Sequence, residues 1–257
     1  MRGLFDYEYQ LEEINKHQPP LQKLNKVIEW EIFRAPIKEA LHVEPKAPGG
    51  RPPFDKLMMF KIIILQRYYN LSDEQTEFQI KDRLSFMQFL GLQIGDTIPD
   101  QKTIWHFKKH KLSKRLFELF TTQLVNNGVI ARKGSIVEAS FVNVPRQRNT
   151  KEENQIIKEG DIPQNFENNP AKLAQKDTDA RWMTKNAERH FGYKNHVNAD
   201  AATKLITKFT TSSASLHDSQ KKAIGKERIE SIIGLLNLTY NLFRYEQLVR
   251  LQKVKII

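Results

Sequence analysis

Cysteine is absent from this chain of 257 residues, and long apolar runs are absent too. Without cysteine the chain has no disulfide, no thiol nucleophile and no zinc site built on thiolates. Apolar runs such as Ile62–Leu65 are far shorter than the ~20 residues that span a bilayer. The first residues, MRGLFDYEYQ, lack a signal-peptide pattern. We therefore expect a soluble, cytoplasmic protein with no membrane partner. A chain without cysteine also suits a reducing compartment.

Nucleotide-binding glycine motifs and a serine-nucleophile elbow are also missing, which disfavours nucleotide-dependent enzymes and serine hydrolases. Positive charge, in contrast, is abundant: 41 Lys and Arg against 30 Asp and Glu give a formal net charge of +11. That balance favours a polyanionic partner, with nucleic acid first among the candidates. The hydrophobic content of 39% is enough for a packed core, so wholesale disorder is excluded.

The first half of the chain has the pattern of a bundle of short helices. Apolar residues between Leu21 and Ile32 follow helical spacing. After the Pro- and Gly-rich stretch at 45–53, Asp55 opens a strongly apolar helix that we expect to lie centrally. Ser72 and Gln75 form a capping-box pattern, and Gly91 stops the helical pattern that follows. A further helix starts at Pro99-Asp100, and another runs from Leu116 to Val125.

The pattern changes at Gly134. SIVEASFVNV, residues 135–144, is rich in β-branched residues and predicts a strand. Residues 145–190 are polar and indicate a long loop or insertion. Two further strands, 191–197 and 204–211, predict a hairpin. A long apolar helix follows at about 224–249. We therefore predict an α+β protein with an all-α domain at 1–130 and a second domain at 131–257 that has three strands and one long helix.

The densest basic cluster spans Lys102 to Arg115. Its cations interleave with Trp105 and Phe107, and they are Lys102, Lys108, Lys109, Lys111, Lys114 and Arg115. Lys and Arg neutralise DNA phosphates, and a helix with such a face fits a DNA groove. A solvated helix face with Trp105 in the core explains the same pattern. His106 and His110, four residues apart, could chelate a metal, although the neighbouring lysines oppose a cation.

Other polar groups lie in the second half. Glu138 is in the middle of an apolar strand, which is costly unless the carboxylate is paired, hydrated or bound to a metal; a place on the open face of the sheet is the simpler explanation. Arg146 and Arg148 follow in a loop and suit a phosphate clamp. Asp177, Asp179 and Arg181 fit ligands, ion-pair partners or turn residues equally well. His217-Asp218 is equally ambiguous.

Several ordered segments together resemble the DDE-type transposases of bacterial insertion sequences. GGRPPFDKLMMFKIIILQRYYNLSDEQTEFQIKDRLSFMQFLGL and DTIPDQKTIWHFKKHKL are similar to the helical N-terminal domain of that family. KGSIVEASFVNVPRQRNT, AQKDTDARWMTKN, HFGYKNHVNAD and LHDSQ resemble the opening of its RNase-H-like catalytic domain, and IIGLLNLTYNLFRYEQLVR resembles its C-terminal helix. The resemblance covers the chain from about Gly49 onward. It implies that the second domain is RNase-H-like and that the partner is double-stranded DNA at the terminal inverted repeats of an insertion sequence.

The family's chemistry needs three carboxylates that hold two divalent ions, Mg²⁺ or Mn²⁺. The resemblance places Glu138 at the first catalytic and metal-binding position, where the family pattern has Asp. The other two carboxylates belong to a segment that should follow Gln220 and is missing, so the sequence indicates an internal deletion near 220–221.

We therefore expect a transposase-family protein that is truncated in its catalytic domain and defective in strand cleavage and transfer. A DNA-binding repressor of transposition and a non-functional relic are the alternatives. The sequence leaves open whether the chain forms a homo-oligomer.

Overall fold

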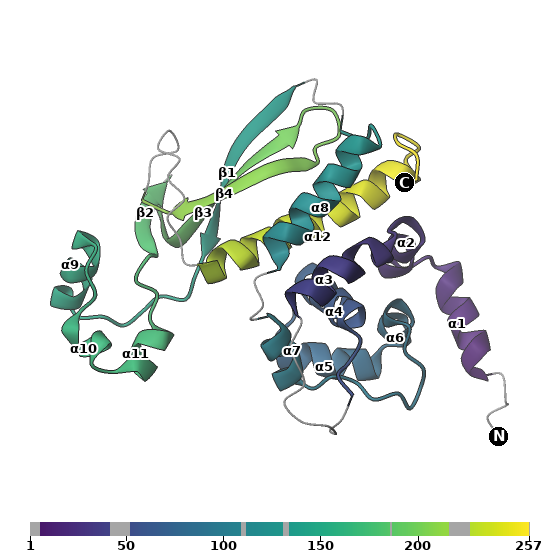
Figure 1. The fold of residues 1–257 in the computed structure, drawn as a ribbon, viewed down its shortest axis with the longest axis horizontal. Coiled ribbons are helices and arrows are strands. Elements are labelled where there is room, and N and C mark those ends of the chain that lie inside the picture. Colours follow the sequence, from purple (N-terminus) through teal and green to yellow (C-terminus); the bar gives the residue numbers. More distant parts are fainter. Residues whose placement is uncertain are drawn as a thin grey trace.

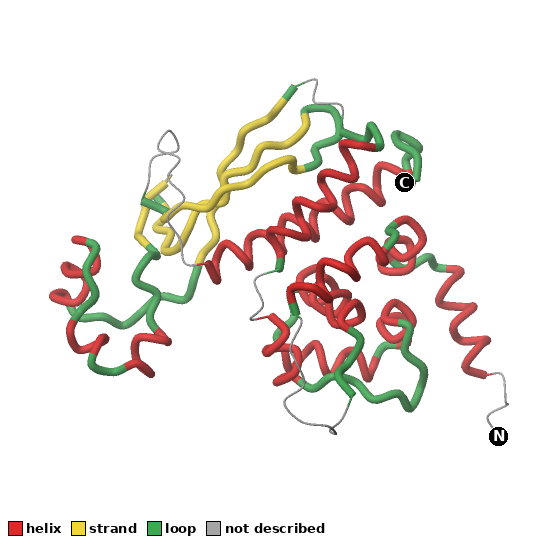
Figure 2. Tube along the Cα trace, in the orientation of Figure 1, coloured by secondary structure: helices red, strands yellow, loops and turns green. Residues whose placement is uncertain are grey.

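The computed structural model describes residues 6–41, 52–108, 112–130, 134–185, 187–215 and 227–256. Within these ranges the chain is of mixed α+β class, with helices and one four-stranded antiparallel sheet. Figures 1 and 2 show the helical N-terminal half at one end, the sheet at the other, and α8 and α12 side by side between them. The helices are α1 (Asp6–Lys16), α2 (Pro20–Val27), the 3₁₀ turn η1 (Trp30–Phe33), α3 (Arg34–Ala40), α4 (Lys56–Tyr69), α5 (Asp73–Asp82), α6 (Leu84–Leu90), α7 (Gln101–Lys108), α8 (Ser113–Asn126), α9 (Lys151–Glu159), α10 (Gln164–Glu167), α11 (Pro170–Gln175) and α12 (Glu227–Arg250). The strands are β1 (Ser135–Asn143), β2 (Arg181–Lys185), β3 (Glu188–Asp200) and β4 (Ile206–Ser213).

Local capping signals in the sequence set the ends of the helices as expected. The Asp55 carboxylate accepts hydrogen bonds from the N–H groups of Leu57 and Met58 and begins α4. Ser72 and Gln75 form the complete capping box of α5, which satisfies two helix N–H groups. Gly91, with a φ of 75°, ends α6. The helical expectation for residues 21–32 is only partly met, because α2 ends at Val27 and a 3₁₀ turn follows.

The sheet is organised around β3. β1 pairs antiparallel with one side of it, and β4 pairs antiparallel with the other side over Tyr193–Ala199. The hairpin predicted at 191–211 is confirmed as β3 and β4. A fourth strand, β2, pairs with the first residues of β3, from Glu188 to Gly192. The predicted count of three strands was therefore wrong.

Of the two alternatives for residues 145–190, a long loop or an insertion, the long loop was wrong. That segment contains α9, α10, α11 and β2, and the three short helices form a separate group beyond the end of the sheet in Figure 1. Their few apolar residues explain the error, because Phe166 and Ile157 are the main buried anchors and periodicity over so few apolar positions is undetectable.

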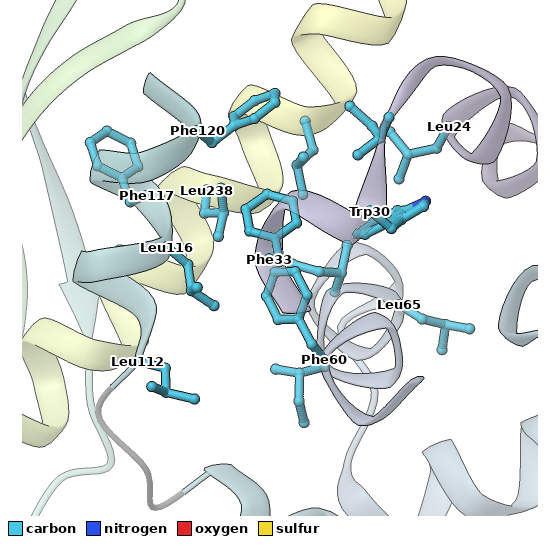
Figure 3. Packing of buried hydrophobic residues seen from close by; sticks show 14 of the residues in the cluster. Leu24, Trp30, Phe33, Phe60, Leu65, Leu112, Leu116, Phe117, Phe120 and Leu238 are labelled. Atoms are coloured by element: carbon cyan, nitrogen blue, oxygen red, sulfur yellow. The ribbon is translucent and has the colours of Figure 1, made fainter. Parts of the chain in front are cut away.

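One apolar core runs through most of the molecule. Figure 3 shows Phe33 and Phe60 of the helical half packed beside Leu116 and Phe120 of α8, with Leu238 of α12 behind them. The same cluster continues to Phe209 of β4, which meets Phe117 at a centroid distance of 5.0 Å. α8 and α12 therefore connect the helical half with the sheet.

Buried amides fix α12 on the sheet. The Asn195 and Asn237 side chains bond to each other at 2.8 and 3.2 Å. Asn241, which is fully buried, accepts from the N–H of Ile206 and donates to its carbonyl, both at 2.8 Å. Unpaired polar groups at this depth would be costly, so these bonds specify one position of α12 along β3 and β4.

No helix in the described part of the chain is long and apolar enough to cross a membrane.

Candidate nucleic-acid interface

The basic stretch from Lys102 to Arg115 is divided between two helices. Lys102 and Lys108 belong to α7, whereas Lys114 and Arg115 are in the first turn of α8. Lys109, Lys111 and His110 lie outside the described residues. The single helical face that we considered from the sequence is therefore two separate helix segments.

Three of these cations are paired with carboxylates from other helices. Lys108 pairs with Asp73 of α5. Lys114 Nζ lies 2.9 Å from Glu230 of α12, and this contact raises the pKa of Lys114. The guanidinium of Arg115 lies 2.5 Å from Glu39 of α3.

The Lys114–Glu230 and Arg115–Glu39 pairs are largely exposed. Exposed pairs contribute only about 0–1 kcal/mol each, so a DNA phosphate can replace these two carboxylates at little cost. Lys102 is exposed on α7. Lys108, Lys114 and Arg115 thus mark a region where α7 and the start of α8 meet α5, α12 and α3. That region is the first candidate for phosphate contact.

Trp105 is partly solvent-exposed at this place. Its side chain is 43% exposed, so the interpretation that it lies in the core is wrong, although Phe107 does pack against the core. Trp105 borders a cavity of about 460 Å³ between α4, α7, α8 and α12. The cavity is lined mainly by apolar side chains, together with Arg67, Asp73 and Lys108.

A second basic and aromatic cluster lies at the far end of the sheet. Arg146 and Arg148, in the segment after β1, are both exposed. The Arg146 guanidinium carbon lies 5.2 Å from the ring centroid of Trp182 in β2. Trp182 is 49% exposed. Neither Trp182 nor the nearby Arg189 was predicted as a site residue, because the short strand that carries Trp182 was not recognised.

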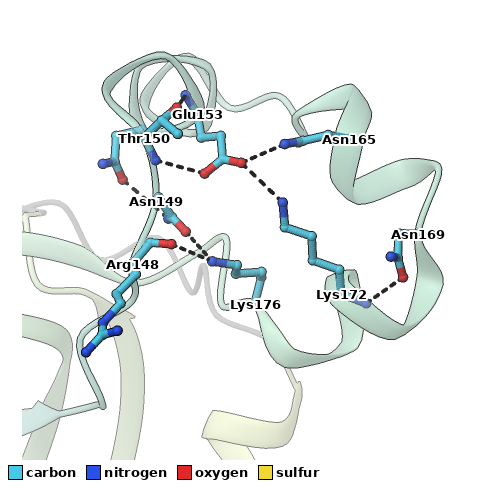
Figure 4. A network of polar contacts seen from close by, with 9 residues as sticks. Arg148, Asn149, Thr150, Glu153, Asn165, Asn169, Lys172 and Lys176 are labelled. Carbon is cyan, nitrogen blue, oxygen red and sulfur yellow. Dashed lines mark hydrogen bonds and ion pairs between the residues drawn. The ribbon is translucent and has the colours of Figure 1, made fainter.

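The backbone around Arg148 is held by a polar network, shown in Figure 4. Lys176 donates to the Arg148 carbonyl at 3.0 Å and to Asn149 at 2.6 Å. Figure 4 shows the Arg148 side chain directed away from this network, which leaves its guanidinium available to an anion.

Glu153 is the centre of the same network (Figure 4). Its carboxylate accepts from Asn165 at 2.6 Å, from Lys172 at 3.3 Å and from the N–H of Thr150 at 2.9 Å. The Asn165 amide, followed by the Thr150 N–H and Lys172, lowers the pKa of Glu153. This buried carboxylate therefore fixes α9, α10 and α11 relative to one another.

Glu138, the predicted catalytic and metal-binding residue, is exposed on β1. It pairs with Val197, which in turn pairs with Phe209. Because side chains alternate across a strand, Glu138 points to the same face as Phe209, which is the face covered by α8 and α12. It is exposed because β1 is at the edge of the described sheet.

Within the parts of the chain that the structure describes, no three His, Asp or Glu side chains lie close enough together to hold a metal ion. Asp200 accepts from the N–H and hydroxyl of Thr203, and Glu246 pairs with Arg250 on α12. His217, Asp218 and the deletion expected near 220–221 lie outside the described residues.

The Asp177–Arg181 segment is a structural turn. Asp177 accepts from the N–H groups of Asp179 and Ala180, both at 3.1 Å, and from the Tyr193 hydroxyl at 2.6 Å. Burial and the bond to Asp177 raise the pKa of Tyr193 well above its ordinary value. Arg181 donates to backbone carbonyls of Thr178, Ala180 and Ile157. Of the three roles left open by the sequence, the geometry supports that of turn residues.

Residues 9–110 match the family model described as a transposase domain (DUF772). The matched region covers most of the helical half and includes Lys102, Trp105 and Lys108. The match supports a transposase-family protein. No solved structure matches the chain.

Proposed function

We propose that this chain is a DNA-binding member of a transposase family that binds the terminal inverted repeats of an insertion sequence and does not carry out strand transfer. The observation that carries the proposal is the transposase-domain match over 9–110, which ends within the basic stretch. The net charge of +11 and the exposed cations of α7 and α8 supply the electrostatic contact that DNA phosphates require.

The catalytic part of the proposal rests on the environment of Glu138. A two-metal site needs several oxygen ligands that converge on the ions. Glu138 lies at the edge of the described sheet, and three other acidic residues have partners elsewhere: Asp200 accepts from Thr203, Glu246 pairs with Arg250, and Glu230 pairs with Lys114. The described residues do not fit the Mg²⁺ or Mn²⁺ pair that the resemblance implies. We therefore assign the protein the role of a binder that competes with intact transposase for the same DNA ends, within an RNase-H-like framework that is incomplete.

Salt-dependent DNA binding tests the first part. Fluorescence anisotropy with duplex DNA from the flanking repeats should show an affinity that falls steeply with salt, with a log–log slope of about −0.9 for each phosphate contacted. In the variant Lys102→Gln/Lys114→Gln/Arg115→Gln, the slope should become shallower by up to about 2.7 if each cation contacts one phosphate.

A charge-matched control separates local contact from net charge. Lys26→Gln/Lys158→Gln/Lys253→Gln removes three exposed lysines from other surfaces and should leave the slope almost unchanged. Binding that is indifferent to salt, or an equal loss in both triple variants, contradicts the proposed interface.

Cleavage of matched end DNA in Mn²⁺ tests the second part. We expect no specific product from the full chain. A specific product that disappears in Glu138→Ala contradicts the assignment of a non-catalytic binder.

A further inference from the structure

Trp182 is a large, half-exposed aromatic ring that is held in place by its neighbours. It pairs across the β2–β3 ladder with Phe191, and their ring centroids are 5.1 Å apart. Phe191 in turn packs against the core. The Trp182 ring is thus supported from within the protein while 49% of its side chain stays in contact with solvent.

Two arginines lie near this ring. The Arg146 guanidinium carbon is 5.2 Å from the ring centroid. Arg189 pairs with Thr184, two residues along β2 from Trp182, and therefore points to the same face of the hairpin. Trp182, Met183, Thr184 and Arg189 border a hollow of about 330 Å³.

This combination matches the requirements of an unpaired nucleotide. Each base has a flat π-face that stacks on an aromatic side chain, and arginines beside the ring bind the flanking phosphates. Bases inside a duplex are stacked on one another, so they cannot reach a ring set into the side of a protein sheet. A DNA ligand that stacks on Trp182 must therefore contain a base that is free of its duplex.

We propose that Trp182, Arg146 and Arg189 bind an unpaired nucleotide of DNA, with the base stacked on Trp182 and its phosphates at the two arginines. This inference rests on the proposed DNA-binding function and specifies its substrate further: duplex DNA with a single-stranded extension or an unpaired base at its end. Trp182 lies in a different part of the fold from Lys102, Lys114 and Arg115, so the two contacts can be removed separately.

The test compares two probes on the full-length chain. One is a blunt duplex, and the other is the same duplex with a short single-stranded oligothymidine tail. We expect the tailed probe to bind more tightly than the blunt one. Stacking of one base changes affinity roughly fivefold to 150-fold when the aromatic ring is removed. Trp182→Ala should therefore weaken binding of the tailed probe by a factor in that range, which removes the advantage of the tail. It should leave the affinity for the blunt duplex unchanged.

Three further variants keep the result interpretable. Trp182→Phe retains a ring and should keep part of the tail advantage, whereas Arg146→Gln should reduce it and its salt dependence. Trp105→Phe is the matched control, because Trp105 is similarly exposed but lies on α7; it should keep the full advantage. The chain has three tryptophans. In the Trp105→Phe background the two that remain are Trp30, which is buried, and Trp182, which is half-exposed. Quenching of tryptophan fluorescence by the tailed probe should then report stacking on Trp182.

The outcomes separate the two proposals. Blunt-duplex binding without a tail advantage, or an advantage that survives Trp182→Ala, overturns the stacking site and leaves DNA binding intact. If the tail advantage is lost in Trp105→Phe, the base stacks on Trp105 and not on Trp182, which also overturns the proposed site. Absence of binding to both probes overturns DNA binding itself. Thermal unfolding of each variant verifies that the fold is retained.

Discussion

Gly192 of β3 lies where β1 and β2 both pair with β3. It pairs with Asn143 of β1 on one side and Arg181 of β2 on the other. Its φ is 149°, and a Cβ atom placed there would lie 2.2 Å from the Val142 carbonyl oxygen. Only glycine fits both the backbone angle and the close approach of β1.

Gly192→Ala should therefore destabilise the protein by about 3 kcal/mol or more, because strain and a backbone clash add. Urea unfolding measures the change. Gly95→Ala is the control, since Gly95 also has a positive φ, of 95°, but no atom lies within 4 Å of the added Cβ; it should cost about 1–2 kcal/mol. Equal losses in the two variants would contradict the clash.

The group formed by α9, α10 and α11 depends on one carboxylate. The folded structure lowers the pKa of Glu153 below its ordinary 4.5, through Asn165, the Thr150 N–H and Lys172. The stabilisation is therefore complete above about pH 4.5 and is lost as the pH falls through the folded value. Hydrogen-exchange protection of α9–α11 should fall in acid before that of α4.

Two substitutions check this pH dependence. Glu153→Gln should lower the protection of α9–α11 at neutral pH and flatten its response to acid. Glu159→Gln, at an exposed position on the same helix, should retain the response. An unchanged acid response in Glu153→Gln would contradict the role of this carboxylate.

The elements that the sequence predicted well are those with strong local signals. Asp55, Ser72 and Gly91 begin or end helices as expected, because caps act within a few residues. The helices at 151–175 were missed although Thr150 and Glu153 form a capping box. Their bodies are short and polar, so the signal at the cap had no apolar periodicity to support it.

The candidate site was less predictable, because it depends on which elements meet. The pairing of Lys108, Lys114 and Arg115 with carboxylates of α5, α12 and α3 joins residues up to 116 positions apart. Trp182 becomes a site candidate only when β2 brings it beside Arg146. Neither the ion pairs between helices nor the contact of Trp182 with Arg146 can be predicted from residue types and spacing.

At the scale of the whole molecule, the helical half and the sheet share one core. Tyr68 of α4 stacks on Phe243 of α12 with centroids 3.8 Å apart, and Phe120 of α8 meets both Phe33 and Tyr245. Since α12 also carries Asn237 and Asn241 against the sheet, loss of either half removes packing from the other.

We therefore expect a single cooperative unfolding transition, with helical and aromatic circular-dichroism signals that change together. A cavity-forming change in α8, Phe120→Ala, should lower the midpoint for both signals, at a cost of about 3–5 kcal/mol. Two separated transitions, or a broad non-cooperative one, would contradict the shared core and favour the relic hypothesis.

The position of Glu138 on β1 has a consequence for solubility. Within the described residues β1 pairs only with β3, so its other side presents unpaired backbone groups, next to the exposed side chains of Ile136 and Val137. Such an edge is a template for pairing between molecules, and a charge in its middle blocks it. Glu138→Val should make the chain self-associate at concentrations where the parent stays monodisperse in light scattering, and Glu138→Lys should not. The residue that resembles a catalytic carboxylate would then act as a gatekeeper against aggregation.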